Sequence, residues 1–286
     1  MNLTNYVNEL CRNYSQHRKS SEYYRNLEQQ LSLLVQNSYE SNSSPETNLN
    51  EDVRFSIPFH SMGNINTKHL FGLDEVIILA FYVSNQNKYK NVLDLGANIG
   101  LHSIALAKLG FDVTCFEADP DTYKVLTKNI KDNGVNVNAI NAAASSFNGQ
   151  AEFTRVCGNM TGSHLSGAKP NPYGKLEKFQ VNVVNIGELA EQYDLIKIDI
   201  EGQEADVLAA IPPKIANKID FMMEINGEAN AKRIFEYTQQ SELNIFLQNR
   251  GWGKVDCLAD LPLSHRDGCV FLSRRSNMPW KNNSDS

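Results

Sequence analysis

Apolar residues near the start of the chain recur every three or four positions, which is the spacing of one helix face. They are Leu3, Val7, Leu10, Tyr14 and His17, then Tyr24, Leu27, Leu31 and Leu34. Because Lys19-Ser20-Ser21 interrupts the pattern, we predict an amphipathic arm of one or two helices. Packing on the rest of the chain is its first explanation, with a dimer contact or a lid as alternatives. Gln36 to Asp52 is rich in Ser, Asn and Glu, which predicts a linker.

Beyond residue 52 the pattern alternates between strand and helix. Val53 to Phe59 predicts a strand, which Pro58 restricts to a sheet edge, and Phe71 to Ser84 predicts a helix. Five further strand patterns follow, at Val92–Leu95, Asp112–Phe116, Val135–Ile140, Leu195–Ile200 and Ile219–Ile225. Helical patterns follow the first two and the last two of these. We therefore predict an α/β domain over residues 53–286, with a mostly parallel sheet covered by helices on both faces, and a separate arm and linker over residues 1–52.

Two segments add to this sheet. Ala151–Val156 and Phe179–Asn185 have strand patterns and flank a loop rich in Gly and Ser from Gly158 to Gly174. A loop of this length in a compact domain is usually functional or mobile. Leu243–Leu247 and Gly268–Ser273 predict two closing strands, which we expect to pair antiparallel at the sheet edge.

Composition narrows the possible functions. With 286 residues and 41% hydrophobic content the chain can bury one large core. A net charge of −6 and a pI near 5.6 argue against a nucleic-acid binder. The longest apolar run, Val76 to Val83, is far shorter than the roughly 20 residues that span a bilayer. The N-terminus lacks the apolar centre of a signal peptide, and the cysteines are widely spaced. We therefore predict a cytoplasmic protein with reduced thiols and no membrane span.

The first candidate site is the run from Asp94 to Gly100 between a strand pattern and a helix pattern. Gly96 allows a tight turn, Asn98 tolerates unusual dihedral angles, and Gly100 allows a ligand to lie against the start of the helix. Glu117 follows Gly96 at the distance typical of an acid that accepts hydrogen bonds from ribose hydroxyls. This layout predicts a pocket for a cofactor that contains a nucleoside.

The spacing of glycines favours S-adenosylmethionine (SAM) over NAD. In the dinucleotide fingerprint begun at Gly96, the second and third glycines would fall at Asn98 and Leu101. A pyrophosphate needs the amide cradle that those glycines provide, whereas SAM has no phosphate and presents a cationic amino group and a sulfonium. A carboxylate such as Asp94 suits those charges. An NAD-linked oxidoreductase and a catalytically silent SAM-fold protein that acts through its arm remain as alternatives.

The second candidate site is the strand pattern that contains Lys197, Asp199 and Glu201. A strand covered on both faces is expected to be apolar throughout, yet these ionisable residues alternate with isoleucines and so share one face. Their burial is costly unless they pair or meet a charged ligand, and the carboxyl end of such a strand borders the ligand crevice of α/β sheets. A Lys197–Asp199 pair that only satisfies itself is the alternative. Glu224 and Asn226 end the next strand and extend the cluster.

These segments together resemble the FkbM family of SAM-dependent methyltransferases. The matching elements, in chain order, are Val92–Gly100, Glu117, Ile196–Glu204 and Glu224. The resemblance covers Asn91 to Asn226 and implies the class I methyltransferase fold, a Rossmann-like seven-stranded sheet whose last strand is antiparallel. It also implies O-methylation, commonly of sugar hydroxyls in polysaccharides, glycolipids or secondary metabolites. The chain departs from the family at Ile186-Gly187, where Leu-Asp is common, and the arm lies outside the resemblance.

The resemblance also implies roles for individual residues. Contacts to the methionine half of SAM would come from Asp94, Gly96, Asn98 and Gly100. Glu117 would accept hydrogen bonds from the ribose, and Ala142 and Ala143 would flank the adenine, although both also fit as core alanines. Asp199 would face the transferred methyl group, with Lys197 and Glu201 in support.

Two mechanisms stay open at this stage. Asp199 could take the proton of the acceptor hydroxyl directly, or Asp199, Glu201 and Glu224 could hold a divalent cation that acidifies it. We assign no residue as a metal ligand. His164 lies in the long loop and is interpreted as a surface residue, with a base as the alternative. We assign no catalytic role to the other histidines considered, which are His60, His69, His102 and His265.

Overall fold

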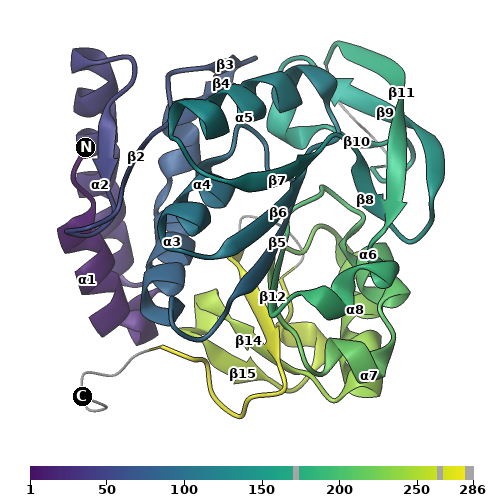
Figure 1. The fold of residues 1–286 in the computed structure, drawn as a ribbon. Coiled ribbons are helices and arrows are strands. Elements are labelled where there is room, and N and C mark those ends of the chain that lie inside the picture. Colours follow the sequence, from purple (N-terminus) through teal and green to yellow (C-terminus); the bar gives the residue numbers. More distant parts are fainter. Residues whose placement is uncertain (170–173, 263–266, 281–286) are drawn as a thin grey trace.

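The computed structural model of the chain describes residues 1–169, 174–262 and 267–280. Its centre is an eight-stranded mixed sheet in the order β15-β14-β16-β13-β12-β5-β6-β7 (Figure 1). The strands are β5 (Asn91–Leu95), β6 (Asp112–Phe116), β7 (Val137–Ile140), β12 (Leu195–Ile198), β13 (Asp220–Met223), β14 (Asn244–Leu247), β15 (Gly253–Val255) and β16 (Val270–Ser273). The pairs from β7 to β13 are parallel, and β16 is antiparallel to β13 and to β14. The sheet has eight strands rather than the predicted seven because β15 pairs with β14 at the edge.

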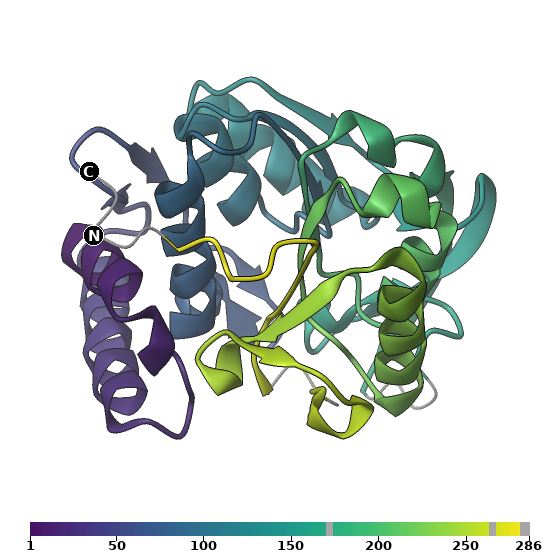
Figure 2. The ribbon, with the colours of Figure 1, turned by 90° about the horizontal axis from the view of Figure 1, so that it is seen from below.

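Helices cover both faces of this sheet, as predicted (Figures 1 and 2). One face carries α3 (Leu73–Asn85), α4 (Leu101–Lys108) and α5 (Pro120–Asp132), and the other carries α6 (Glu204–Ala210), α7 (Pro213–Ala216) and α8 (Glu228–Ser241). Local sequence explains where α5 begins, because Pro120 occupies its first turn and the Asp119 side chain accepts hydrogen bonds from two backbone amides of that turn. Helix α3 is apolar around most of its circumference, which fits a position between the sheet and the arm.

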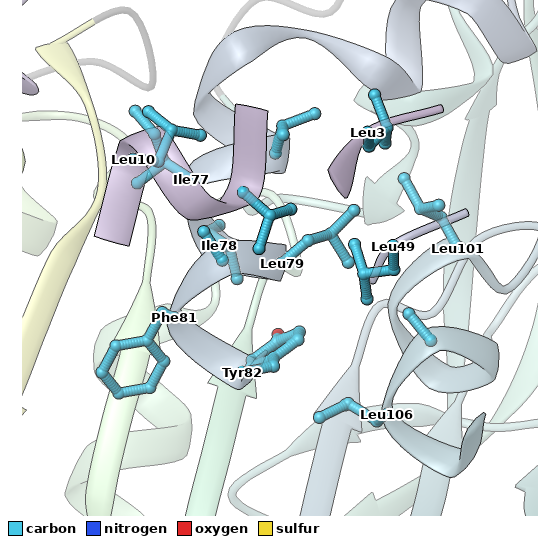
Figure 3. Close-up of a cluster of buried hydrophobic side chains, with 14 of the residues drawn as sticks. Leu3, Leu10, Leu49, Ile77, Ile78, Leu79, Phe81, Tyr82, Leu101 and Leu106 are labelled. Atoms are coloured by element: carbon cyan, nitrogen blue, oxygen red, sulfur yellow. The ribbon is translucent and has the colours of Figure 1, made fainter. Parts of the chain in front are cut away.

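The arm consists of α1 (Thr4–Arg12) and α2 (Glu22–Ser41), and its apolar stripe packs on the core. Leu3 and Leu10 lie in one buried cluster with Ile77 and Leu79 of α3 (Figure 3). The first explanation of the stripe, packing on the rest of the chain, is therefore the one the structure has. His17 lies beyond α1 in a turn, where it is fully buried and burial lowers its pKa to about 3.

The linker prediction for Gln36 to Asp52 is wrong in detail. Helix α2 continues to Ser41, and β1 (Glu46–Asn48) then pairs antiparallel with β2 (Arg54–Ser56). Leu49 lies between these strands and is fully buried, so this polar segment contains one residue that packs in the core. The predicted edge strand shortens to β2, and the chain reaches α3 through β3 (Ser61–Met62), β4 (Ile65–Asn66) and the 3₁₀ turn η2 (Thr67–Phe71).

The predicted insertion forms a separate four-stranded sheet. Its strands are β8 (Ala143–Ser145), β9 (Gly149–Val156), β10 (His164–Leu165) and β11 (Leu176–Asn185), in the order β10-β9-β11-β8. Arg155 of β9 binds Asp119 through two nitrogens, each at 2.6 Å, and covers the Phe179 ring with its guanidinium 4.9 Å from the ring centroid. These contacts fasten the insertion to the first turn of α5. The long loop carries a further 3₁₀ turn, η3 (Met160–Gly162), and its residues 170–173 lie outside the described residues.

Further 3₁₀ turns complete the regular structure around the two sheets. They are η1 (Tyr14–Gln16), η4 (Ile186–Glu188), η5 (Ala190–Gln192) and η6 (Gln248–Arg250), with η7 (Leu258–Asp260) before the last gap. The five cysteines all lie in the described residues and are reduced thiols. In the described ranges, no helix has both the length and the apolar character that a bilayer crossing requires.

Candidate active site

A cavity of about 500 Å³ lies at the carboxyl ends of the central strands. Its floor is formed by the residues that follow β5, β6, β7, β12 and β13, and the insertion and the β4–α3 segment supply the remaining walls. Seven of the predicted site residues line it, namely Gly96, Asn98, Glu117, Ala142, Ala143, Asp199 and Glu201. The volume falls within the roughly 300–1,000 Å³ typical of small-molecule sites. The strand ends are therefore open to a ligand rather than filled by hydrophobic side chains.

The glycine turn holds β5 against its two neighbours. Gly96 has a φ of +83°, and a Cβ there would lie 1.8 Å from the backbone oxygen of Asp199. The amides of Gly96 and Ala97 both donate to the backbone oxygen of Phe116, at 3.0 and 2.9 Å. Only glycine permits this approach, because any Cβ would collide with backbone. Asn98 follows with a φ of +52° and faces the cavity.

Gly100 is required where α5 packs on the start of α4. Its φ is +99°, but the position of its missing Cβ is only 2.7 Å from Cδ1 of Leu126 on α5. The glycine therefore allows α5 to pack closely on the start of α4, and it does not line the cavity. The sequence pattern located a required glycine correctly, and its predicted contact with SAM stays a prediction.

Glu117 joins the glycine turn to the start of α5. Its carboxylate accepts hydrogen bonds from the backbone amides of Asn98 and Asp119, each at 2.9 Å. The side chain lines the cavity with 9% of its surface exposed, and burial raises the pKa of Glu117 to about 7 although both amides favour the charged form. Each carboxylate oxygen can accept more than one hydrogen bond, so Glu117 retains capacity for two ribose hydroxyls.

Asp94 and Lys197 lie beneath the cavity and do not line it. Asp94 is fully buried, accepts a hydrogen bond from Ser103 and lies 3.7 Å from the Lys197 ammonium. Lys197 also lies 3.3 Å from Asp199. Burial disfavours its charge, but Asp199 and Asp94 hold the pKa of Lys197 well above its usual value. One Asp94 oxygen accepts the hydrogen bond from Ser103 and the other has no hydrogen-bond partner among the described residues, so a direct contact of Asp94 with the cofactor stays a prediction, and the residue does not line the cavity.

The end of β12 explains how the acidic residues reach the cavity. The strand ends at Ile198, two residues before the predicted end, and Glu201 has a φ of +55°. The alternation argument therefore holds for Lys197 and Asp199 but not for Glu201, which reaches the cavity from a turn. Glu201 forms an ion pair with Lys169 of the insertion, and burial raises its pKa despite that pair.

Three cavity residues were missed or misjudged from the sequence. Glu75 falls in the predicted helix Phe71 to Ser84 and was not assigned to the site, yet it lines the cavity and lies 2.7 Å from Nε2 of His102. His164 was interpreted as a surface residue but is 2% exposed, and burial lowers its pKa. Lys169 was not considered. No spacing in the sequence connects these residues with the glycine turn, because α3 and the insertion meet it only in the folded chain. His265 lies outside the described residues.

Glu224 extends the acidic cluster as predicted. It lines the cavity from the end of β13, and burial together with Asp199 and Glu75 raises its pKa well above the usual value. Within the described part of the chain, no group of three or more His, Cys, Asp or Glu side chains has an arrangement suited to a metal ion.

Comparison with known proteins gives one family match and several weaker likenesses. The Methyltransferase FkbM domain matches residues 94–251, which is more than half of the chain. The hexuronic acid methyltransferase AglP of Haloferax volcanii is 25% identical over 154 residues, which cover 53% of this chain and 62% of that protein. The chain thus spans less than two thirds of this relative.

Two solved structures are similar in part. A precorrin-6y C5,15-methyltransferase from Geobacter metallireducens has a TM-score of 0.38 at 12% identity, over 69% of this chain and 85% of that one. The SAH-bound Podospora anserina methyltransferase PaMTH1 has a TM-score of 0.36 at 11% identity, over 72% and 79% of the two chains.

Proposed function

The chain belongs to the methyltransferase FkbM family and is a SAM-dependent methyltransferase, and from this premise we propose that it methylates a hydroxyl of a sugar, glycan or secondary metabolite. The family match covers both candidate segments, so an NAD-linked oxidoreductase and a catalytically silent SAM-fold protein are set aside. The name of the AglP relative supports a sugar acceptor. The observation that carries the proposal is that carboxylates from β12 and β13 line the same cavity as Glu117 and the glycine turn.

The cavity residues fit SAM from one end to the other. In this proposal Glu117 accepts hydrogen bonds from the ribose hydroxyls, and Ala142 and Ala143 leave room for the flat adenine ring. Gly96 and Asn98 border the methionine half. When bound, SAM supplies an electrophilic methyl group on a cationic sulfur. The chain must then hold an acceptor oxygen in line with that methyl group and remove its proton.

Asp199 is the proposed proton acceptor. When the acceptor oxygen takes the methyl group from SAM, the Asp199 carboxylate would accept the proton that the hydroxyl loses, and the sulfur would keep the electron pair of its broken bond to carbon. Lys197 fixes that carboxylate from below at 3.3 Å, and Glu201, paired with Lys169, lines the cavity beside it. The insertion, with His164 and Lys169 on the cavity wall, excludes water and contacts the acceptor.

A methyl-transfer assay tests this function. Purified chain is incubated with isotopically labelled SAM and a panel of neutral sugars, amino sugars, uronic acids and glycans, and the methylated products are located by mass spectrometry. We expect the label on a hydroxyl oxygen of a sugar. Label found only on nitrogen, carbon or a carboxylate would contradict the proposal. Repeating the assay after dialysis against EDTA separates direct proton transfer to Asp199, which keeps its rate, from a route that needs a divalent cation.

A further inference from the structure

The α-ammonium of SAM needs an anionic partner that Asp94 does not provide. A buried cation is costly unless it is paired and hydrogen-bonded. Asp94 is fully buried below the cavity, where Ser103 donates to it and Lys197 faces it. The partner must therefore be another carboxylate, one that reaches the cavity itself.

Glu75 meets this requirement. It lies in the first turn of α3, lines the cavity with Gly96 and Asn98, and exposes 26% of its side chain. Its partner is His102, which lies in the first turn of α4 directly after the glycine turn, with 2.7 Å between Nε2 of His102 and Oε2 of Glu75. Glu75 is thus held beside the segment that borders the methionine half of SAM. It also lies outside the residues 94–251 that match the family.

The other cavity carboxylates are less suited to bind an ammonium. Burial together with Asp199 and Glu75 raises the pKa of Glu224 well above its usual value, which disfavours the charge that an ammonium needs. Asp199 is paired with Lys197, and Glu201 with Lys169. Glu117 is bound by two backbone amides at the ribose position, and burial raises its pKa to about 7. Burial also disfavours the charge of Glu75, but the hydrogen bond with His102 and the charges of His102 and Lys197 outweigh it and hold the pKa of Glu75 below its usual value.

We propose that Glu75 binds the α-ammonium group of SAM and that His102 positions its carboxylate. The assignment gives the cofactor site an anchor that comes from α3, before the family region begins. It rests on SAM binding and not on the identity of the acceptor. A failure to methylate sugars would therefore leave it standing.

The test measures whether Glu75 contributes to ligand binding only through the amino group of the ligand. Calorimetry compares S-adenosylhomocysteine with its deaminated analogue, which keeps the carboxylate, in the wild type and in Glu75→Gln. Hydrogen bonds to charged groups are worth roughly 1.5–3 kcal/mol, so we expect the wild type to prefer the amine by roughly 10- to 100-fold. In Glu75→Gln this preference should fall below about threefold while the affinity for the analogue changes little. Retained binding of the analogue shows that the variant is folded.

Asp74→Asn is the matched control, because it removes the same charge from the same helical turn. Asp74 is directed at the arm, where it accepts a hydrogen bond from Tyr24 at 2.7 Å and pairs with Lys19 at 2.6 Å. We expect this variant to keep the preference for the amine. A preference that persists in Glu75→Gln, or that disappears in both variants, would overturn the assignment. A wild-type chain that binds neither ligand would overturn it together with the SAM site.

Discussion

Replacing Gly96 by alanine should break the joint between β5 and β12. A left-handed backbone costs a residue with a Cβ about 1–2 kcal/mol, and Gly96 has a φ of +83°. The added Cβ would lie 1.8 Å from the backbone oxygen of Asp199, so the two strand ends must separate. That movement strains the hydrogen bond from the Asp199 amide to the Leu95 oxygen at 3.0 Å. With overpacking included, we expect the free energy of unfolding to fall by about 4 kcal/mol.

Gly110→Ala separates the effect of strain from the effect of the close approach. Gly110 also has a positive φ, +92°, but no heavy atom of the described residues lies within 4 Å of the position that a Cβ would take, so only the strain of about 1–2 kcal/mol applies. At roughly 2–4 °C per kcal/mol for a chain of this size, Gly96→Ala should melt roughly 6 °C below Gly110→Ala. Calorimetry should also show that Gly110→Ala binds S-adenosylhomocysteine and Gly96→Ala does not. Equal melting temperatures and equal binding would refute the argument.

Three further predictions follow from the site. Asp199→Asn should bind S-adenosylhomocysteine with an affinity within a few-fold of wild type. Its turnover on an accepted sugar should fall by about 10²- to 10⁴-fold. Near-normal rates would reject Asp199 as the proton acceptor. Burial raises the pKa of Glu117 to about 7, and ribose hydroxyls bind best to its ionised form. The affinity for S-adenosylhomocysteine should therefore weaken by up to about tenfold per pH unit as the pH falls below 7. In Glu117→Gln titrations that dependence should disappear, and an unchanged slope would assign it to another group. Arg155→Lys should lose the two-nitrogen contact to Asp119. Because the Asp119 amide donates to Glu117, we expect this variant to bind the cofactor several-fold more weakly. A lower melting temperature with unchanged affinity would limit Arg155 to a structural role.

Much of the fold could be predicted because its signals are local. Five strand patterns and the glycine turn indicated the parallel half of the sheet, and β14 and β16 pair antiparallel as expected. The extra strand β15 was missed because three residues, Gly253 to Val255, carry no detectable alternation. The linker prediction failed because one apolar residue, Leu49, hardly changes the polar composition of the segment. Its burial depends on residues that are distant in the sequence.

The site was predicted where its residues are consecutive and not where they meet only in three dimensions. Asn98 and Asp199 lie in the two segments whose patterns stood out, Glu117 was identified by its distance from Gly96, and all three line the cavity. The direction of a buried side chain could not be predicted. The sequence pattern around Asp94 is the same whether its carboxylate faces a ligand or Lys197. Glu75 could not be connected with the site at all, since the packing of α3 on α4 brings it there.

The arm remains a separate question. Its buried stripe is occupied by α3, so a dimer contact through the arm, one of the alternatives for this segment, would have to use the outward faces of α1 and α2. Light scattering of the intact chain and of a variant with a charged residue at the exposed Leu33 tests that prediction. A dimer that the substitution leaves intact would exclude this part of the arm as the contact.

A crystal structure of the chain with S-adenosylhomocysteine tests the central claim most directly. The account predicts the ribose hydroxyls on Glu117, the amino group on Glu75 and the sulfur directed at Asp199, all within the 500 Å³ cavity. A ligand bound elsewhere, or bound with its sulfur directed away from the end of β12, would contradict it.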